Sequence, residues 1–276
     1  MNSSKINFFY FIPMKDNILI LSRHGERIDR SNETQRSNKY DPELTKKGVS
    51  LSQNIGIQIA NEFRSYINLN GIKLYSSPFT RALETVLSMR NEFSKIIPEK
   101  SEQELTIIKD LGEFNQKKEF PFDVYPTLLY YLNGKNEKET KLYDELIKNK
   151  MNENVKYNLK YVDYGKVKYP ESQKYADKRY VYVLQKILKE FENKENTIIN
   201  ITAHGEVLYA MNKYLLGLIK QSAIKNGLNE NDVKATWPDF LNSLNGNNQK
   251  YCNSLCYRVS PDGDVSYYGT IIPTNL

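Results

Sequence analysis

The sequence predicts an α/β fold in which helices flank a mostly parallel β-sheet. Short apolar runs of the kind found in buried strands alternate with longer segments whose apolar residues recur at helical spacing. Two of these runs, 17–22 and 197–203, each lead into a His-Gly-Glu sequence. Ligands bind to open α/β sheets just beyond the carboxyl ends of the strands, so both histidines are expected there. His24 and His204 are the two histidines of the 276-residue chain.

The first strand and helix follow from the N-terminal part of the chain. The apolar residues 17–22 predict a buried strand that delivers His24, and the polar residues 28–42 predict a loop over its end. Thr45 suits the N-cap of the next helix, because its hydroxyl can accept a backbone hydrogen bond in the first turn. We expect the apolar side of this helix to pack on the sheet.

A second strand and helix follow, and then a third strand. Residues 72–75 predict the strand, and Pro78 suits the first turn of the next helix, where the N–H that proline lacks would have no partner. Arg81 falls in that turn and is expected to face the strand end, although an arginine there, taken by itself, is more often a surface residue. Residues 105–108 predict the third strand.

The regular alternation ends soon after the third strand. Residues 115–170 are Lys-rich and aromatic and predict a helical or irregular insertion or lid, with a short helix over 139–150. The remaining elements are a helix over 171–191, a strand over 197–203 followed by a helix, a polar surface excursion over 217–250, and a hairpin of 254–260 and 265–272. We expect a single domain over 1–276, with its core over about 16–276.

Composition narrows the classes of function. The net charge of +6 suits an anionic ligand and is too small to indicate a nucleic-acid partner. Cys252 and Cys256 lack a Cys/His ligand group around them, which argues against zinc and predicts buried packing residues in a reducing compartment. No apolar run reaches the ~18 residues of a membrane helix, and residues 6–14 predict an edge strand or loose leader rather than a signal peptide. A cytoplasmic protein with no membrane partner is expected.

The residues at the predicted strand ends suit phosphate chemistry. Arginine stays charged and binds phosphate through two donors, and Arg23, Arg27 and Arg81 all lie near these ends in the sequence. The neutral imidazole of His24 can attack phosphorus and form a phosphohistidine, and nearby guanidinium groups favour that neutral form. His204 is expected to converge on the same edge of the sheet.

The leaving oxygen of a phosphate monoester also needs a proton donor. Glu113, just past the third predicted strand, is the preferred candidate, and it could then activate the water that hydrolyses the intermediate; Asp110 is its rival. Glu26 and Glu206 directly follow the two His-Gly pairs, a position that favours hydrogen bonding within a loop.

Four blocks of sequence, in the same order, resemble the histidine phosphatase superfamily, also called phosphoglycerate-mutase-like. Arg-His-Gly at 23–25 is similar to its signature, and 41–48 is similar to its Leu-Thr-x-x-Gly helix start. Residues 75–85 resemble its Ser-Ser-Pro…Arg…Thr block, and Ala-His-Gly at 203–205 resembles its second histidine. A lone Arg-His-Gly sequence is weak evidence for this family, whereas four blocks in the same order over residues 18 to about 210 are specific evidence for it.

Further segments are most similar to one subgroup, the ubiquitin-associated and SH3-containing phosphatases (suppressor of T-cell receptor signalling type) and the ecdysteroid-phosphate phosphatases. These segments are 24–29, 111–114, 158–163, 171–179 and 252–255. True phosphoglycerate mutases carry an Asn shortly after Arg-His-Gly and then Gly-Trp, whereas this chain has Arg-Ile-Asp-Arg at 27–30 and its one tryptophan at Trp237. The resemblance therefore favours a hydrolase over a mutase.

The resemblance implies a three-layer α/β/α sandwich and a role for each matching residue. His24 would be phosphorylated, Glu113 would donate the proton, and His204 would stabilise the transferring group. Phosphate would be held by Arg23, Arg27 and Arg81. The expected enzyme uses no metal or other cofactor, and proteins of this kind commonly form homodimers.

The expected function is that of a histidine-acid-phosphatase-like phosphomonoesterase working through phospho-His24. Two alternatives stay open: a phosphoglycerate-mutase-type phosphotransferase, and a catalytically silent scaffold that binds a phospho-ligand. The full set of His, Arg and Glu residues argues against the scaffold, because a pure binder needs no acid. The expected substrate is a phosphorylated small molecule or a phosphotyrosine protein, with specificity residing in 115–170 and 217–250.

Overall fold

The computed structural model describes residues 15–30, 41–95, 103–115, 157–162, 164–165, 167–227 and 251–274. Its centre is a seven-stranded sheet in the order β4-β3-β2-β5-β1-β6-β7. The strands are β1 Asn17–Arg23, β2 Lys73–Ser76, β3 Gln103–Ile108, β4 Tyr157–Val162, β5 Ile198–Ala203, β6 Ser254–Val259 and β7 Val265–Ile271. The helices are α1 Lys46–Glu62, α2 Arg64–Asn70, α3 Thr80–Phe93, α6 Gln173–Leu188 and α7 Gly205–Lys225, with short 3₁₀ turns η1 Ile28–Arg30, η2 Lys109–Leu111 and η3 Lys189–Phe191.

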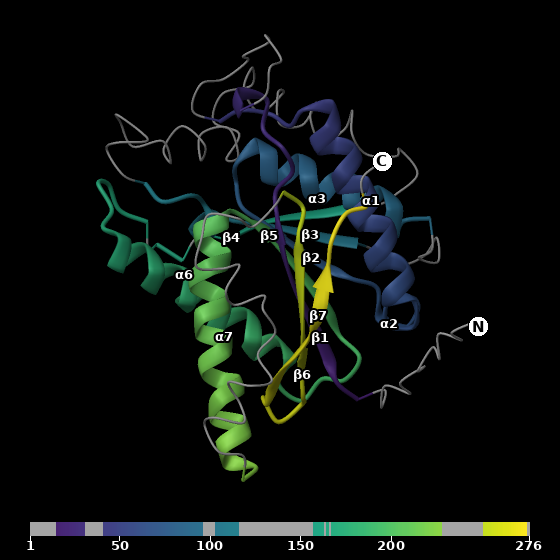
Figure 1. Ribbon diagram of the computed structural model, residues 1–276, viewed down its shortest axis with the longest axis vertical. Coiled ribbons are helices and arrows are strands. Elements are labelled where there is room, and N and C mark those ends of the chain that lie inside the picture. The colour runs from purple at the N-terminus through teal and green to yellow at the C-terminus, as the bar shows by residue number, and fades with distance from the viewer. Residues whose placement is uncertain are drawn as a thin grey trace, which may run out of the picture.

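Helices cover both faces of the sheet, so the predicted three-layer α/β/α sandwich is confirmed (Figure 1). Side chains alternate along β1 between two cores. Ile18 and Ile20 pack in the core with α1 and α3, whereas Leu19 and Leu21 pack in the core with α6 and α7. Four consecutive apolar residues thus fill two layers, which is why this strand lacks the polar alternation of a half-exposed one.

The order of the central strands brings three segments to one edge of the sheet. β5 lies between β1 and β2 and runs parallel to both. Arg23 is in register with Ala203, and Ser76 is in register with Thr202. Because parallel strands end at the same edge, the residues that follow β1, β5 and β2 become neighbours there. The C-terminal strands β6 and β7 complete the other side of the sheet as the predicted hairpin, antiparallel to β1.

The starts of two helices test the predicted boundaries. Thr45 is the N-cap of α1, and its hydroxyl accepts a hydrogen bond from the Gly48 N–H at 2.8 Å, as predicted. Pro78 does not lie in the first turn of α3, which begins at Thr80. The strand pairing extends to Ser77, whose N–H donates to the Thr202 carbonyl at 3.0 Å, so the backbone is still extended before the proline. The surface loop expected over 28–42 instead begins with η1.

The second half of the chain corrects two predictions. The polar excursion expected over 217–250 begins as helix, because α7 continues to Lys225; its polar residues there lie on the solvent side of a long surface helix. The insertion expected over 115–170 contributes β4, which extends the parallel sheet beyond β3. The sequence of β4 is rich in Lys, Asn and Tyr and has no continuous apolar run. The sequence pattern therefore did not indicate a strand there. The predicted helix over 139–150 and the N-terminal 6–14 lie outside the described residues.

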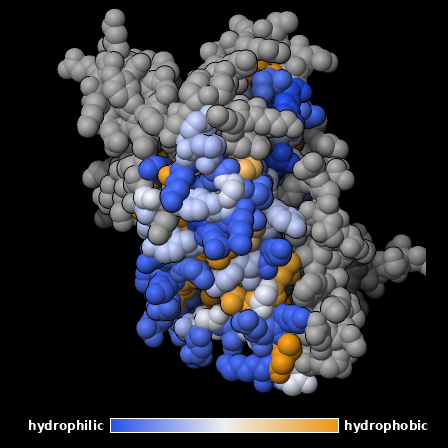
Figure 2. Space-filling view, turned by 90° about the vertical axis from the view of Figure 1, so that its left-hand side faces the viewer, coloured by the Kyte–Doolittle hydropathy of each residue, from blue (hydrophilic) through white to orange (hydrophobic). Residues whose placement is uncertain are grey.

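The face of the molecule beside α6 and α7 is mainly hydrophilic where the structure describes it (Figure 2). Its hydrophobic areas are small and separate, as is usual for a water-facing surface. None of the described helices is both long and apolar enough to span a lipid bilayer. Cys252 and Cys256 are free thiols buried in the core, as predicted from the lack of a ligand group around them.

A close contact between two backbone segments explains the glycines of the first two sequence blocks. A Cβ added at Gly25 would lie 2.7 Å from the Gly48 carbonyl oxygen, and a Cβ added at Gly48 would lie 2.5 Å from the Glu26 carbonyl oxygen. The first turn of α1 therefore packs directly on the backbone that follows β1. The Glu26 side chain closes this contact by accepting a hydrogen bond from the Thr45 hydroxyl at 2.9 Å.

Gly48→Ala is expected to destabilise the fold and loosen the segment after β1, because the new methyl group meets backbone atoms that cannot rotate away. The expected cost is on the order of 2 kcal/mol, as for overpacking in a tight interior. Gly217→Ala is the matched control, since it lies inside α7 with open space around its Cβ and should stabilise by about 0.5–1 kcal/mol. Urea unfolding measures both; equal effects would contradict the close contact.

Candidate active site

Two buried histidines lie side by side where β1 and β5 end. His24 directly follows β1 and His204 directly follows β5, and their ring centroids are 5.3 Å apart. His24 is 2% exposed and His204 is fully buried. The two His-Gly-Glu sequences therefore meet at the sheet edge where ligands bind in this class of fold.

The ring of His24 is held in one orientation and one tautomer. Its Nδ1 lies 2.8 Å from the carbonyl oxygen of Gly25. Because a carbonyl can only accept, Nδ1 carries the hydrogen, and Nε2 keeps its lone pair. Burial lowers the pKa of His24 well below its usual value, and the positive charges of Arg81 and Arg23 lower it further. His24 is therefore a neutral imidazole at neutral pH, which is the form that acts as a nucleophile.

His204 is oriented by a neighbour that the sequence did not single out. Its Nε2 lies 2.7 Å from the hydroxyl oxygen of Ser77, which follows β2. Its Nδ1 has no hydrogen-bond partner among the described residues and lies 3.9 Å from a carboxylate oxygen of Glu113. Burial, followed by the charge of Arg81, lowers the pKa of His204 well below its usual value. A Ser77 hydroxyl that donates to Nε2 leaves the hydrogen of the neutral ring on Nδ1, toward Glu113.

Ser77→Ala is expected to lower turnover about 10-fold, because one buried hydrogen bond fixes the tautomer of His204. Ser76→Ala is the matched control, because its hydroxyl is equally buried and donates to the Ser77 carbonyl, at 2.9 Å, and not to a histidine. The measurement is phosphate release by each variant under saturating substrate. Equal losses in the two serine variants would show that Ser77 acts only through packing.

Arg81 is the most enclosed cation of the site. It lies in the first turn of α3, as predicted, and is fully buried rather than a surface residue. One of its terminal nitrogens, Nη2, donates to Glu113, and the other lies 3.5 Å from Asp41. Its guanidinium carbon lies 4.4 Å from the centre of the Phe79 ring. Asp41 also accepts hydrogen bonds from the N–H and hydroxyl of Thr80, so one carboxylate holds both Arg81 and the start of α3.

Arg27 reaches the same carboxylate from another direction. Asp29 holds Arg27 through two hydrogen bonds, from Nε at 2.9 Å and from Nη2 at 2.7 Å. Its Nη1 lies 3.8 Å from Glu113. Burial lowers the pKa of Arg27, but the hydrogen bonds to Asp29 and the charge of Glu113 outweigh this and leave it raised. Arg27 is thus a fixed cation with one edge turned to Glu113.

Arg23 lies at the end of β1 and stacks on an aromatic ring. Its guanidinium carbon is 4.9 Å from the centre of the Tyr251 ring, which in turn lies 5.8 Å from the ring of His24. Burial lowers the pKa of Arg23, but a guanidinium stays charged at neutral pH. The structure therefore brings together all six predicted site residues: Arg23, His24, Arg27, Arg81, Glu113 and His204.

The contacts of the carboxylates distinguish Glu113 from its rivals. Glu113 follows η2, and its oxygens face Arg81, Arg27 and His204. The buried side chain of Asp110 instead accepts a hydrogen bond from the Tyr164 N–H at 2.8 Å. Glu26 bonds Thr45, within its own loop contact, as predicted. The geometry favours Glu113 over Asp110 as the acid, because the oxygens of Glu113 face Arg81, Arg27 and His204.

Glu206 has both a loop role and a charge role. One of its oxygens accepts a hydrogen bond from the Phe114 N–H at 3.2 Å, next to Glu113. Burial, followed by the charge of Glu113, raises the pKa of Glu206 to about 7. Near neutral pH, Glu206 can therefore carry a proton beside the candidate acid.

Glu206→Gln is expected to flatten the pH dependence of stability. The native protein holds the Glu206 proton more tightly than the unfolded chain, whose ordinary value is 4.5, so stability falls as pH rises from about 4.5 to about 7. Gln removes this decline and should stabilise by on the order of 2 kcal/mol at pH 8, with no gain at pH 4. Urea unfolding across this range, with exposed Glu195→Gln as control, measures it; unchanged slopes would contradict the assignment.

Sequence reasoning missed Ser77, Asp41, Asp29 and Tyr251. Ser77 lies in the block 75–85 and Asp41 lies in the block 41–48. The resemblance therefore included both residues but did not indicate what they contact. Tyr251 reaches the site only because β6 pairs with β1, a pairing that no local pattern indicates. Among the residues that the structure describes, no group of three or more His, Cys, Asp or Glu side chains is placed to hold a metal ion.

The site combines a neutral histidine, a second buried histidine and fixed guanidinium groups at one sheet edge, a set of groups that can hold the oxygens of an anion such as a phosphoryl group. Residues 19–118 match the model of the histidine phosphatase superfamily (branch 1). The matching model is that of the superfamily which the sequence blocks resemble, and it covers the first helix, the block that contains Arg81 and most of the first strand. The matched residues hold five of the six site residues, all except His204.

Solved structures with overall likeness have low sequence identity. Phosphoserine phosphatase from Entamoeba histolytica, in complex with 3-phosphoglyceric acid, is 17% identical, with 92% of this chain and 96% of that chain covered and a TM-score of 0.46. Phosphoglycerate mutase from Bacillus anthracis str. Sterne is 16% identical, with 93% of each chain covered and a TM-score of 0.46. The sequence comparison with curated proteins gives no match.

Proposed function

We propose that the protein is a phosphomonoesterase that transfers a phosphoryl group to His24 and then to water. One observation carries the proposal: Nε2 of a neutral, oriented histidine is available among three guanidinium groups. Arginines of this kind neutralise the oxygens of a bound phosphoryl group and stabilise the charge that develops during transfer. The other catalytic group is Glu113, whose carboxylate lies among the same cations.

The two half-reactions use His24 and Glu113 in turn. In the first, Nε2 of His24 attacks phosphorus, the bond from phosphorus to the ester oxygen breaks, and protonated Glu113 gives its proton to that oxygen. In the second, Glu113 takes a proton from water, the water oxygen attacks phosphorus, and the bond to His24 breaks, which releases inorganic phosphate and regenerates the enzyme.

The proposed substrate is a phosphorylated small molecule or a phosphotyrosine protein. The Arg-Ile-Asp-Arg sequence at 27–30 supports hydrolysis over phosphoryl transfer between hydroxyl groups, because it replaces the Asn and Gly-Trp segment of phosphoglycerate mutases. Asp29 holds Arg27 at the edge of the site through two hydrogen bonds. The similarity of this segment to the ubiquitin-associated and SH3-containing subgroup supports the same choice.

A panel of phosphomonoesters tests the proposal. We expect release of inorganic phosphate from p-nitrophenyl phosphate and from at least one of phosphotyrosine peptide, sugar phosphate, nucleotide and steroid phosphate. Rapid acid-free quenching should trap a phosphohistidine, which is stable to alkali. Interconversion of phosphoglycerates without phosphate release would identify the mutase alternative. Tight binding of phosphate esters with no turnover and no phosphohistidine would identify the silent scaffold.

A further inference from the structure

A buried ion pair outside the phosphate site joins Arg179, in the second turn of α6, to Glu171, which precedes the N-cap residue Ser172. Arg179 donates from Nε to one oxygen of Glu171 at 2.7 Å and from Nη2 to the other at 2.6 Å. Both side chains are fully buried. Their hydrogen-bond partners include the backbone on both sides of Glu113, the candidate acid.

The third nitrogen of Arg179 holds the chain just before Glu113. Its Nη1 donates to the carbonyl oxygen of Asp110 at 2.6 Å and to that of Gly112 at 3.2 Å. A guanidinium can do this while keeping its two bonds to Glu171, because its five N–H groups point outward in one plane. Two carbonyls within three residues are thus fixed by one buried side chain.

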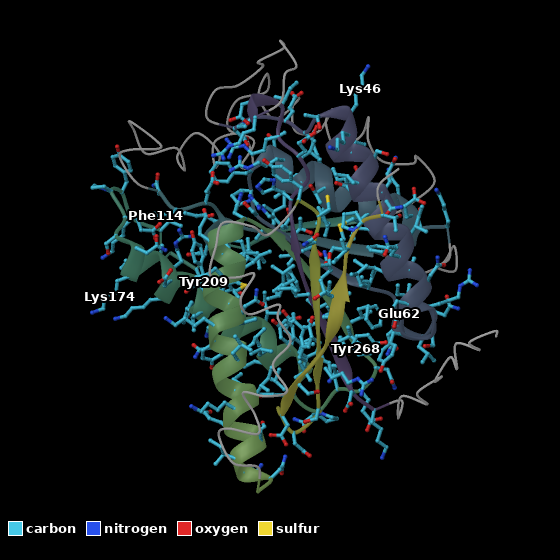
Figure 3. All side chains as sticks on the ribbon, viewed as in Figure 1. Lys46, Glu62, Phe114, Lys174, Tyr209 and Tyr268 are labelled. Carbon is cyan, nitrogen blue, oxygen red and sulfur yellow. The ribbon has the colours of Figure 1, made fainter. Side chains whose placement is uncertain are left out.

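Glu171 holds the chain just after Glu113. Its carboxylate accepts a hydrogen bond from the Asn115 N–H at 3.2 Å, and its own N–H donates to the Asn115 carbonyl at 2.9 Å. Phe114, between these contacts, donates its N–H to Glu206 at the start of α7. Figure 3 shows Phe114 beside the upper end of α7, on the side where α6 lies. The backbone on both sides of Glu113 is therefore fixed by one ion pair.

The arginines that face Glu113 are also candidate ligands of the phosphoryl group. The carboxylate of Glu113 bonds Arg81 and faces Arg27, and these are the cations that a phosphoryl group would engage. Once phosphate oxygens take up those cations, the position of the carboxyl group depends on its backbone. A shift of ~1 Å in a reacting group can cost about 10²-fold in rate.

We propose that Arg179 and Glu171 are positioning residues that set Glu113 at proton-transfer distance from the leaving oxygen; this inference rests on the proposed phosphomonoesterase. The proposal predicts an effect that depends on the leaving group. A nitrophenolate leaves readily without a proton, whereas phenolate is a poorer leaving group and needs the acid more. Loosening the Arg179–Glu171 pair should therefore slow phenyl phosphate far more than p-nitrophenyl phosphate.

The variants are Arg179→Lys, which cannot bond a carboxylate and two carbonyls in one plane, and Glu171→Gln, which keeps the shape and removes the charge. Glu113→Gln serves as the reference for loss of the acid. Tyr257→Phe is the matched control, because it removes another buried hydrogen bond, to Asn212 at 2.6 Å. Thermal unfolding of each variant separates loss of folded protein from loss of rate.

We expect kcat/KM, which reports the transfer to His24 and not the later hydrolysis, to fall about 10–100-fold on phenyl phosphate in the Arg179→Lys and Glu171→Gln variants, in line with the contribution of general acids. On p-nitrophenyl phosphate kcat/KM should change less than about 3-fold. Glu113→Gln should show the same selectivity, and Tyr257→Phe should show none. Equal losses on the two esters, or no loss on either, would overturn the positioning role. If Arg179→Lys does not fold, Glu171→Gln decides alone. Absence of turnover in the unaltered protein would overturn the proposed function itself, and the positioning role with it.

Discussion

Replacing His24 with asparagine is expected to lower phosphomonoester turnover by about 10⁴-fold or more, since the variant has no nucleophile and forms no covalent intermediate. Asn keeps a polar group of similar length near the Gly25 carbonyl, so the fold should be preserved. The measurement is phosphate release from p-nitrophenyl phosphate, together with trapping of phosphate on the protein.

The second histidine supplies a sharp control for this experiment. The chain has two histidines, so any phosphohistidine belongs to His24 or His204. His204→Asn should react slowly but still accumulate label, because Nε2 of His24 remains available. His24→Asn should accumulate none. Label in His24→Asn, lost in His204→Asn, would reverse the two assignments.

The geometry explains why His24 rather than His204 is expected to carry the phosphoryl group. The Nδ1 of His24 is engaged by a carbonyl, which leaves a lone pair on Nε2. The Nε2 of His204 is engaged by Ser77, and its Nδ1 faces the carboxylate of Glu113. A hydrogen on that Nδ1 makes His204 a donor to phosphoryl oxygen instead of a nucleophile.

The sequence pattern predicts which residues follow the strands at the edge of the sheet. It does not predict the strand order or the side chains that orient these residues. His24, His204 and Arg81 were predicted because an apolar strand followed by a polar residue has a local signature, and parallel strands end at one edge. The order β2-β5-β1, which puts the two histidines on neighbouring strands, depends on long-range pairing that no window of sequence contains. The same holds for β4, whose polar sequence becomes a strand only because β3 offers it a free edge.

The side chains that support the site residues could not be predicted either, because they are distant from them in the sequence. Asp41 lies 40 residues before Arg81 in the chain, and Arg179 lies 66 residues after Glu113. In the fold, Asp41 lies 3.5 Å from Arg81, and Arg179 donates to the Asp110 carbonyl at 2.6 Å, close to Glu113. A charged side chain at these positions is by default a solvated one, so the sequence favours the surface interpretation until burial is known.

Arg81→Ala is expected to have the second largest effect, on both activity and stability. The loss of a fully buried guanidinium removes a phosphate ligand and should lower kcat/KM about 10³-fold, equivalent to ~4 kcal/mol of transition-state stabilisation. It also leaves Asp41 and Glu113 without their nearest cation. Breaking a buried pair from one side typically costs about 3–5 kcal/mol.

The stability loss should depend on pH in a direction that Asp41 determines. Burial raises the pKa of Asp41 to about 6, although Arg81 and the hydrogen bonds from Thr80 work against this. The native protein therefore holds this proton more tightly than the unfolded chain, whose ordinary value is 3.8, and stability falls as pH rises from about 4 to about 6. Without Arg81 the pKa of Asp41 rises further, so the decline should extend above pH 6. Arg81→Ala should thus be more damaging at pH 8 than at pH 5 in urea unfolding.

A double variant separates the two roles of Arg81. Adding Asp41→Asn removes the buried negative charge that Arg81 no longer offsets, while the amide oxygen can still accept the Thr80 N–H, which Asp41 accepts at 2.8 Å. Arg81→Ala/Asp41→Asn should therefore recover much of the stability at pH 8 and lose the steep pH dependence. Turnover should stay low, because asparagine restores neither a cation nor a phosphate ligand. Recovery of turnover along with stability would mean that Arg81 supports only the start of α3, and that phosphate is held by Arg23 and Arg27 alone.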